Sequence, residues 1–222
     1  MKIVHVITTI NKGGAETHLV DLVRLQRENN YQVVVIYLKG DSYWAREYNK
    51  IGVSTVNLKI KNYWQLLFDR KLKRVLENFH PDIVHSHLGP AELYSFLNLK
   101  NTTNFVVSKH NRKKFAPIPF SKTLMRRIAK RASKVISISD AVALFLIKEG
   151  LSKDKIRTIH YGINSQPFKN VTKQQVKIFR DQYGVNNNTL LFVFLCSWID
   201  IAKTNKIILF TEEVHKYKML SI

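Results

Sequence analysis

The stretch "KIVHVI" (Lys2–Ile7) leads through "TTINKGGAETH" (Thr8–His18) into "LVDLVRLQRENN" (Leu19–Asn30). The first piece is a short apolar run typical of a buried strand, and the third spaces its apolar residues as one face of a helix does. The glycine pair Gly13-Gly14 lies between them. A strand that passes through a glycine turn into a helix favours a parallel α/β fold.

The same alternation continues to about residue 160. We expect strands at Ile3–Ile7, Tyr31–Leu38, Val53–Leu58, Asp82–His87, Asn104–Lys109, Lys134–Ser139 and Lys155–His160. We expect helices at Ala15–Glu28, Ser42–Lys50, Tyr63–Phe79, Pro90–Leu99, Phe120–Ala132 and Asp140–Glu149. The pattern predicts a doubly wound, Rossmann-like parallel sheet in an α/β domain, whose ligands bind outside the carboxyl ends of the strands.

The chain changes character after residue 168. We expect one Rossmann-like domain at residues 1–168, followed at 169–222 by a linker helix (Val171–Tyr183) and a fresh strand (Thr189–Trp198). Those last 54 residues are too few for a second α/β domain, because each βαβ unit needs about 30 residues or more. We interpret residues 169–222 as the linker helix and the incomplete start of a second domain.

Composition narrows the classes of partner. Lys and Arg number 36 against 16 Asp and Glu, a formal net charge of +20, which favours anionic partners. The single cysteine, Cys196, excludes an internal disulfide framework and a zinc site built on several thiolates. No run is apolar enough for a signal peptide or a membrane span. We expect a cytoplasmic protein, with peripheral association at the inner face of the membrane as an option.

Two motifs at expected strand ends could carry chemistry. Bare amides at Gly13 and Gly14, at the N-terminus of a helix, suit a phosphate or another anion, although a plain tight turn explains the pair equally well. His85 and His87 point to the same side of one strand, where histidines serve acid–base chemistry or bind metal. No third ligand has convincing spacing, so no metal is expected. We interpret His85 as a hydrogen-bonded core residue and His87 as a functional residue at the crevice.

Ten Lys and Arg residues and no acid lie between Lys109 and Lys134. A solvated helix face is the ordinary explanation. The absence of acids and the interleaved apolar residues favour contact with an anionic membrane surface instead, through Arg126, Arg127, Lys130 and Arg131. Nucleic acid is the competing partner, and no recognised nucleic-acid motif supports it.

The pieces together resemble a known family. "NKGGAETHLVDLV", "HPDIVHSHLGPA", "VVSKHN", "KVISISDAVALFLIKEGLSKDKIRTIHYGIN" and "QPF" follow one another as in the N-terminal half of a family 4 glycosyltransferase. The resemblance covers about residues 1–170. It implies a GT-B fold, in which two Rossmann-like domains face a cleft, and transfer of a sugar from a nucleotide sugar to a glycan or lipid-linked acceptor with retention. The nucleotide sugar is then a substrate, and neither cofactor nor metal is implied.

The resemblance also implies roles for single residues. Gly13 and Gly14 approach the donor diphosphate. His87 lies near the transferred sugar and is the implied catalytic residue, whereas His110 and Asn111 contact the acceptor side. Ser139-Asp140 lies at the cleft, where Ser139 is also expected to cap the following helix.

The sequence departs from the family pattern at three places. The family's "NGVD" reads Tyr161-Gly162-Ile163-Asn164 here. Ser197 and Trp198 stand near the place of the diphosphate-binding arginine, and Lys203 is a candidate for the accompanying lysine. The family's paired glutamates have no counterpart in this chain.

Two functional readings follow. The first is a transferase, inactive or weak as this chain alone, which is either a truncated product or one half of a split enzyme that pairs with a separate C-terminal half. The alternative is a non-catalytic module that binds an acceptor or an anionic membrane.

Overall fold

The computed structural model describes residues 1–62, 64–65, 68–112, 121–162, 165, 169–185, 190–194, 206–210 and 217–221. The chain divides into two compact units, residues 1–162 and 163–222, which are described separately. Among the described residues, none of the helices combines the length and the apolar character needed to cross a bilayer.

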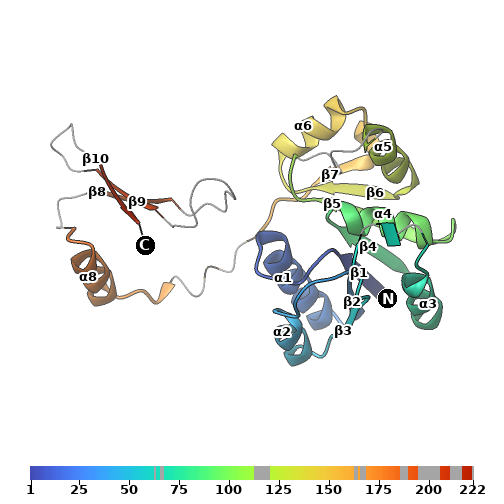
Figure 1. Ribbon diagram of the computed structural model, residues 1–222, viewed down its shortest axis with the longest axis horizontal. Helices are drawn as coiled ribbons and strands as arrows, with labels where there is room; N and C mark the ends of the chain where they lie inside the picture. Colours follow the sequence, from blue (N-terminus) through green and yellow to red (C-terminus); the bar gives the residue numbers. More distant parts are fainter. Residues whose placement is uncertain are drawn as a thin grey trace. The chain divides into compact units, whose positions relative to one another are not determined.

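The first unit is built on seven parallel strands in the order β3-β2-β1-β4-β5-β6-β7 (Figure 1). This is the doubly wound, Rossmann-like sheet that the alternating sequence pattern predicts. Its strands are β1 (Lys2–Ile7), β2 (Gln32–Tyr37), β3 (Ser54–Asn57), β4 (Ile83–His87), β5 (Asn104–Lys109), β6 (Lys134–Ser137) and β7 (Ile156–Thr158). Its helices are α1 (Gly14–Glu28), α2 (Ala45–Lys50), α3 (Lys71–Phe79), α4 (Gly89–Asn98), α5 (Ser121–Arg131), α6 (Asp140–Lys148) and the 3₁₀ turn η2 (Lys153–Lys155).

The second unit contains α8 (Lys173–Gln182), where the linker helix was expected, and a three-stranded antiparallel sheet. Its strands are β8 (Leu190–Phe194), β9 (Lys206–Phe210) and β10 (Tyr217–Ser221). Helix α8 begins with a capping box, in which Thr172 accepts a hydrogen bond from the Gln175 backbone and the Gln175 side chain reaches back to Thr172.

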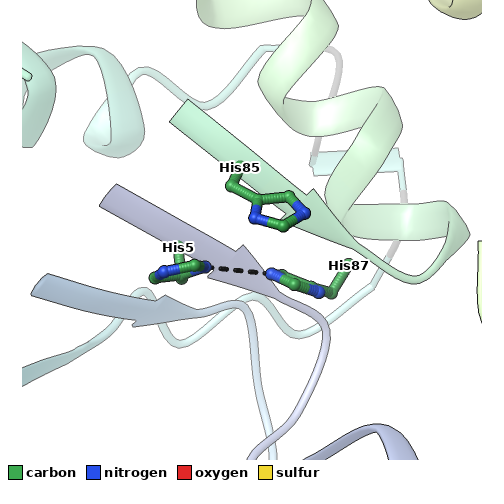
Figure 2. A group of neighbouring side chains, drawn as sticks. All are labelled: His5, His85 and His87. Atoms are coloured by element: carbon green, nitrogen blue, oxygen red, sulfur yellow. Dashed lines mark hydrogen bonds between the residues drawn. The ribbon is translucent and has the colours of Figure 1, made fainter. Parts of the chain in front are cut away.

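Strand alternation directs β1 residues to two different cores. Val4 and Val6 pack in one cluster with residues of α3 and α4, whereas Ile3 and Ile7 pack in another with residues of α1 and α2. His5 falls between Ile3 and Ile7 and therefore faces α1. Strand β4 lies beside β1 with His5 paired to His85 and Ile7 to His87, so that three histidine rings gather on one face of the sheet (Figure 2).

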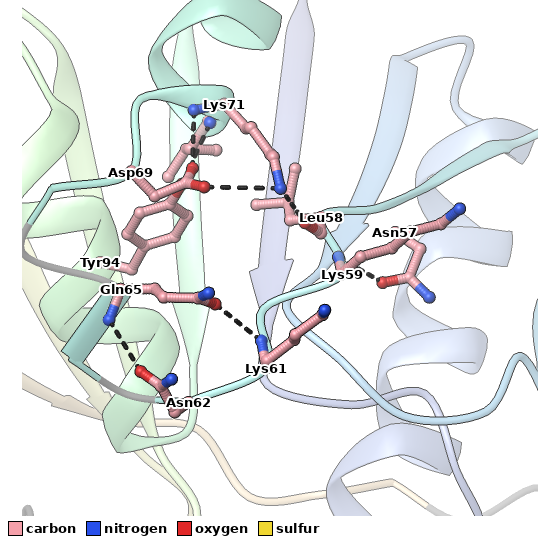
Figure 3. A network of polar contacts seen from close by, with 10 residues as sticks. Asn57, Leu58, Lys59, Lys61, Asn62, Gln65, Asp69, Lys71 and Tyr94 are labelled. Carbon is pink, nitrogen blue, oxygen red and sulfur yellow. Dashed lines mark hydrogen bonds and ion pairs between the residues drawn. The ribbon is translucent and has the colours of Figure 1, made fainter.

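The helix expected at Tyr63–Phe79 is shorter than the sequence pattern indicates. It begins only at Lys71, because Asp69 draws the chain into a turn, and Tyr63 lies outside the described residues. The Asp69 carboxylate accepts hydrogen bonds from the Lys71 backbone at 2.8 Å and from the Tyr94 hydroxyl on α4 (Figure 3). The Lys71 ammonium group donates to the Leu58 carbonyl at 2.9 Å. Local polar contacts therefore hold this loop where helical spacing predicted a helix.

Candidate ligand site at the carboxyl edge of the sheet

The strand order reverses between β1 and β4, which lie side by side at the centre of the sheet. In a doubly wound sheet this switch point opens a crevice, because the connections after the two strands leave in opposite directions. After β4 the chain turns sharply: Leu88 has φ +71°, in the left-handed region, and α4 begins directly afterwards with Pro90 in its first turn. His87 is thus the last strand residue before the crevice.

The two glycines of the β1–α1 turn have different surroundings. A Cβ at Gly13 would lie 2.3 Å from Glu16 Oε2, because the Glu16 carboxylate folds back over it and accepts from Thr9 Oγ1 at 2.9 Å. A Cβ at Gly14 would meet nothing within 4 Å. No side chain caps the N-terminus of α1. Gly13 accommodates a carboxylate of its own chain, and Gly14 alone leaves open backbone that a ligand can approach.

The buried histidines form a connected cluster. His5 Nδ1 lies 3.0 Å from His87 Nε2, and His5 Nε2 lies 2.8 Å from the side-chain oxygen of Gln26 on α1. His87 Nδ1 lies 3.2 Å from His110 Nε2. His85 stands apart from this series, with its Nε2 2.8 Å from Ser108 Oγ, although its ring centroid is 4.1 Å from that of His87. His85 is therefore the hydrogen-bonded core residue that its position on the strand predicts.

Burial sets the protonation of these rings. It lowers the pKa of His5 and of His110 to about 4, and it holds the pKa values of His85 and His87 well below the ordinary value of 6.5. The neighbouring histidines lower the pKa of His87 further, since each would repel a second positive charge. All four rings are neutral at neutral pH.

The cluster reaches the carboxyl edge of the sheet through His110 and Tyr161. The Tyr161 hydroxyl lies within hydrogen-bond reach of His110 Nδ1. The Tyr161 ring stacks on His18 of α1, with the centroids 3.6 Å apart and the planes 15° from parallel. His87, the residue expected to touch the sugar, is fully buried, whereas His110 and Tyr161 are only partly covered. The sequence resemblance marks Tyr161 as a departure from the family's asparagine, and here its side chain supplies a polar group in that place.

Other residues predicted from the sequence lie around the same edge. Asn111 is exposed beside His110, immediately after β5. Ser139 caps α6 as expected, accepting a hydrogen bond from the Val142 backbone at 3.3 Å. Asp140 follows in the first turn of α6, its side chain 79% exposed, with Oδ2 3.9 Å from His160 Nε2. Nothing in these contacts brings Ser139 or Asp140 to the histidine cluster.

A buried ion pair lies next to this site. The Lys109 ammonium group at the end of β5 contacts the Glu92 carboxylate in the first turn of α4, and both side chains are at least nine-tenths buried. Sequence reasoning missed this pair, as it missed His5 and Gln26. The signal for His5 was present in the sequence: a histidine alternating with Ile3 and Ile7 in a central strand must face a helix and needs a polar partner.

The predicted basic patch on α5 divides into two parts. Arg126 donates through Nε to the Glu149 carbonyl at 2.9 Å, and Arg131 donates through Nη2 to the Thr103 carbonyl at 3.0 Å, so both guanidinium groups bind other segments of the fold. Arg127 and Lys130 are exposed and form no ion pair with any residue that the structure describes.

Several residues named from the sequence fall outside the described part of the chain. They are Ile163, Asn164, Ser197, Trp198 and Lys203.

A shallow pocket of about 540 Å³ lies beside the β1–α1 turn, lined by Asn11, Lys12, Asp41, Ser42 and Tyr43. The Lys12 ammonium group sits over the Tyr43 ring, 5.0 Å from its centroid, and Tyr43 is half exposed. An exposed aromatic ring flanked by polar side chains suits a carbohydrate, which presents both C–H faces and hydroxyl groups.

Comparison with known proteins agrees with this fold. The chain is 29% identical over 214 residues to the capsular polysaccharide biosynthesis glycosyltransferase CapH of Staphylococcus aureus, covering 91% of this chain and 58% of the relative. Among solved structures, a glycosyltransferase from Rickettsia africae matches with a TM-score of 0.68 at 24% identity, covering 84% of this chain and 50% of the other. Anabaena Alr3699/HepE, solved with UDP and glucose, matches with a TM-score of 0.65 at 19% identity, covering 85% and 51%.

The chain thus spans about half the length of the proteins it matches. The sequence model of Glycosyltransferase Family 4 matches residues 12–166, most of the first unit and of the chain. The seven-stranded sheet, its switch point and the motifs along its carboxyl edge all fall within or beside that match, and the chain belongs to glycosyltransferase family 4.

Proposed function

We propose that this chain provides the acceptor-side half of a retaining glycosyltransferase that uses a nucleotide-sugar donor and a glycan or lipid-linked acceptor. The observation that carries the proposal is the arrangement at the switch point: open backbone at Gly14, a partly exposed His110–Tyr161 pair and a pocket with an exposed aromatic ring line one edge of the sheet. Alr3699/HepE, a structural relative, was solved with UDP and glucose, which supports a nucleotide-sugar ligand.

Each part of this edge has a chemical task under the proposal. The amides that begin α1 at Gly14 approach the donor diphosphate, since a helix N-terminus attracts negative charge. Gly13 serves this site indirectly by giving the Glu16 carboxylate room. His87 acts through His110, because its ring is fully buried and both of its nitrogens already face other histidines. Asn111, Ser139 and Asp140 remain candidate cleft residues.

The leaving diphosphate must be stabilised as its charge develops. In the described residues, Gly14 offers backbone amides at this edge, and the second unit is far shorter than an α/β domain. We therefore expect little or no sugar transfer by this chain alone. Lys203 stays a candidate for additional positive charge.

The test combines binding and turnover. The full chain is titrated with UDP-glucose and with UDP-N-acetylglucosamine while the nuclear magnetic resonance signals of Gly14, His110 and Tyr161 are followed. At least one donor should shift these signals, and Gly14→Asp should abolish the shifts by placing a carboxylate where the diphosphate approaches. Gly14→Ala, which fits the open space, is the matched control. Shifts confined to other surfaces contradict the site, and rapid transfer by the chain alone contradicts the expected inactivity.

A second function, peripheral binding to an anionic membrane, rests on Arg127 and Lys130, the two exposed cations of α5 that form neither a hydrogen bond nor an ion pair among the described residues. Flotation with phosphatidylglycerol vesicles measures it. The double change Arg127→Gln and Lys130→Gln should weaken flotation without lowering stability. Arg126→Gln and Arg131→Gln should lower stability as well, since these groups tether other segments.

A further inference from the structure

We propose that Gln26, His5, His87, His110 and Tyr161 form a directional hydrogen-bond relay that presents the Tyr161 oxygen as an acceptor for a ligand hydroxyl group. The relay runs from α1, through β1 and β4, to the carboxyl edge of the sheet. The part that identifies the ligand as a sugar rests on the proposed function. The relay itself rests on geometry within the first unit.

The direction follows from the valence of imidazole. A neutral histidine has one N–H and one nitrogen lone pair, so each ring in a chain must donate on one side and accept on the other. The Gln26 oxygen only accepts, which makes His5 Nε2 the donor and leaves His5 Nδ1 to accept from His87 Nε2. His87 Nδ1 then accepts from His110 Nε2, and His110 Nδ1 accepts from the Tyr161 hydroxyl. The orientation of the Gln26 amide therefore fixes the tautomers of His5, His87 and His110.

The surroundings keep the relay intact. Charging any ring would turn its accepting nitrogen into a donor that faces another donor, and burial already disfavours that charge. The parallel stack on His18 fixes the plane of the Tyr161 ring. Figure 2 shows the His5–His87 contact at the centre of the relay, with the His85 ring beside it and outside the series.

The relay has a consequence for recognition. Because the Tyr161 proton is committed to His110, the oxygen presents lone pairs to a ligand at this edge. Lone pairs accept from hydroxyl groups and repel the oxygens of a phosphate. Tyr161 therefore selects the sugar portion of a ligand, whereas the open amides at Gly14 suit its diphosphate.

The same histidines could instead hold a metal ion. Ligand nitrogens of His5, His85 and His87 all lie within 4.8 Å of one another, and three imidazoles are a familiar zinc ligand set. A metal would take the lone pair of His5 Nδ1 and displace the proton of His87 Nε2. The metal site and the relay thus exclude each other, and one measurement separates them.

The tautomers can be read directly from the full chain labelled with ¹⁵N-histidine, because long-range proton–nitrogen correlation spectra distinguish Nε2–H from Nδ1–H. We expect His5, His87 and His110 to be Nε2–H tautomers. Gln26→Leu should mix the tautomers as far away as His110, three hydrogen bonds along the series. Ser108→Ala is the matched control: it removes the partner of His85 and should leave His110 unchanged.

A second variant keeps the relay testable if Gln26→Leu fails to fold. Tyr161→Phe, at the partly exposed end, should change only the signals of His110 Nδ1 and leave the tautomers of His5 and His87 as they are. Any of three results would overturn the relay. The first is that Nδ1–H tautomers dominate, and the second is that the His110 signals do not change on Gln26→Leu although the chain is folded. The third is that His5 and His87 bind one equivalent of zinc.

Ligand selection is tested by titrating UDP and UDP-glucose separately. Tyr161→Phe should weaken UDP-glucose binding about fivefold, the loss expected for one hydrogen bond, and leave UDP binding unchanged. Equal weakening of both ligands, or of neither, overturns the sugar assignment. If the unchanged chain binds neither ligand, the proposed donor site fails and the sugar assignment fails with it, while the tautomer spectra still decide the relay.

Discussion

Acid should unfold the first unit by protonating histidines that its core keeps neutral. The pKa of His5 and of His110 falls from 6.5 to about 4 on burial, and those of His85 and His87 fall well below 6.5. The unfolded chain therefore binds more protons than the folded one as the pH falls from about 6.5 toward 4. The four neutral rings leave the free energy of unfolding undiminished above about pH 6.5, and their protonation in the unfolded chain lowers it as the pH falls toward 4.

The magnitude follows from linkage. Between about pH 7.5 and pH 5.5, each such histidine lowers the free energy of unfolding by roughly 1.4 kcal/mol. The four buried rings together cost about 5 kcal/mol, which is a large part of the total stability of a typical domain, about 5–15 kcal/mol. We expect the unfolding free energy to fall by about 5 kcal/mol over this interval, which is an average of about two protons per molecule, with the slope approaching four protons near pH 5.5.

Urea unfolding at a series of pH values measures this slope. Trp44 fluorescence reports on the first unit when Trp64 and Trp198 are replaced by Phe. His85→Asn should lower the slope near pH 5.5 by about one proton, because it removes one of the four buried rings. A loss below about 1 kcal/mol between these pH values would mean that the four rings are not kept neutral by the fold, and the argument from burial would be refuted.

Two further predictions concern stability. Gly13→Ala should lower the free energy of unfolding in urea by about 1 kcal/mol, because the new methyl group displaces the Glu16 carboxylate from its hydrogen bond. Gly14→Ala should be neutral or stabilising by up to about 1 kcal/mol, because it lies at the start of a helix with open space around it. Equal effects of the two changes would contradict the different surroundings of the two glycines. Lys109→Met should lower the free energy of unfolding by about 3–5 kcal/mol, because it leaves the Glu92 carboxylate buried and unpaired. Adding Glu92→Leu should restore much of that loss. A double variant no more stable than the single one would contradict the assignment of this loss to an unpaired charge.

Local pattern was sufficient for most of the fold. Apolar runs of strand length that alternate with helical spacing specify a parallel sheet, and all seven expected strands form in it. The pattern failed at Tyr63–Phe79, where apolar and basic residues keep a helical spacing but Asp69 bonds to the Lys71 backbone and to Tyr94. Tyr94 is 25 residues away in the sequence, and no local pattern contains that contact.

The sequence indicated where the candidate site lies, but it did not predict which side chains contact one another there. Its expected position follows from the ends of parallel strands, and the strand ends together with the family resemblance pointed to Gly14, His87 and His110. Only the structure shows their neighbours: the Glu16 carboxylate occupies the space over Gly13, and the ring of His87 is fully buried and lies next to His110.

The sequence by itself determined the order of the elements, the edge of the sheet at which we expect a ligand and the resemblance to family 4 glycosyltransferases, because these depend on spacing along the chain. Tertiary structure alone decided that His5, His87 and His110, from three different strands or strand ends, share hydrogen bonds with one another and with Gln26 and Tyr161. Sheet register and helix packing set those contacts. An imidazole takes its tautomer from the groups within about 3 Å of its nitrogens and its lowered pKa mainly from burial.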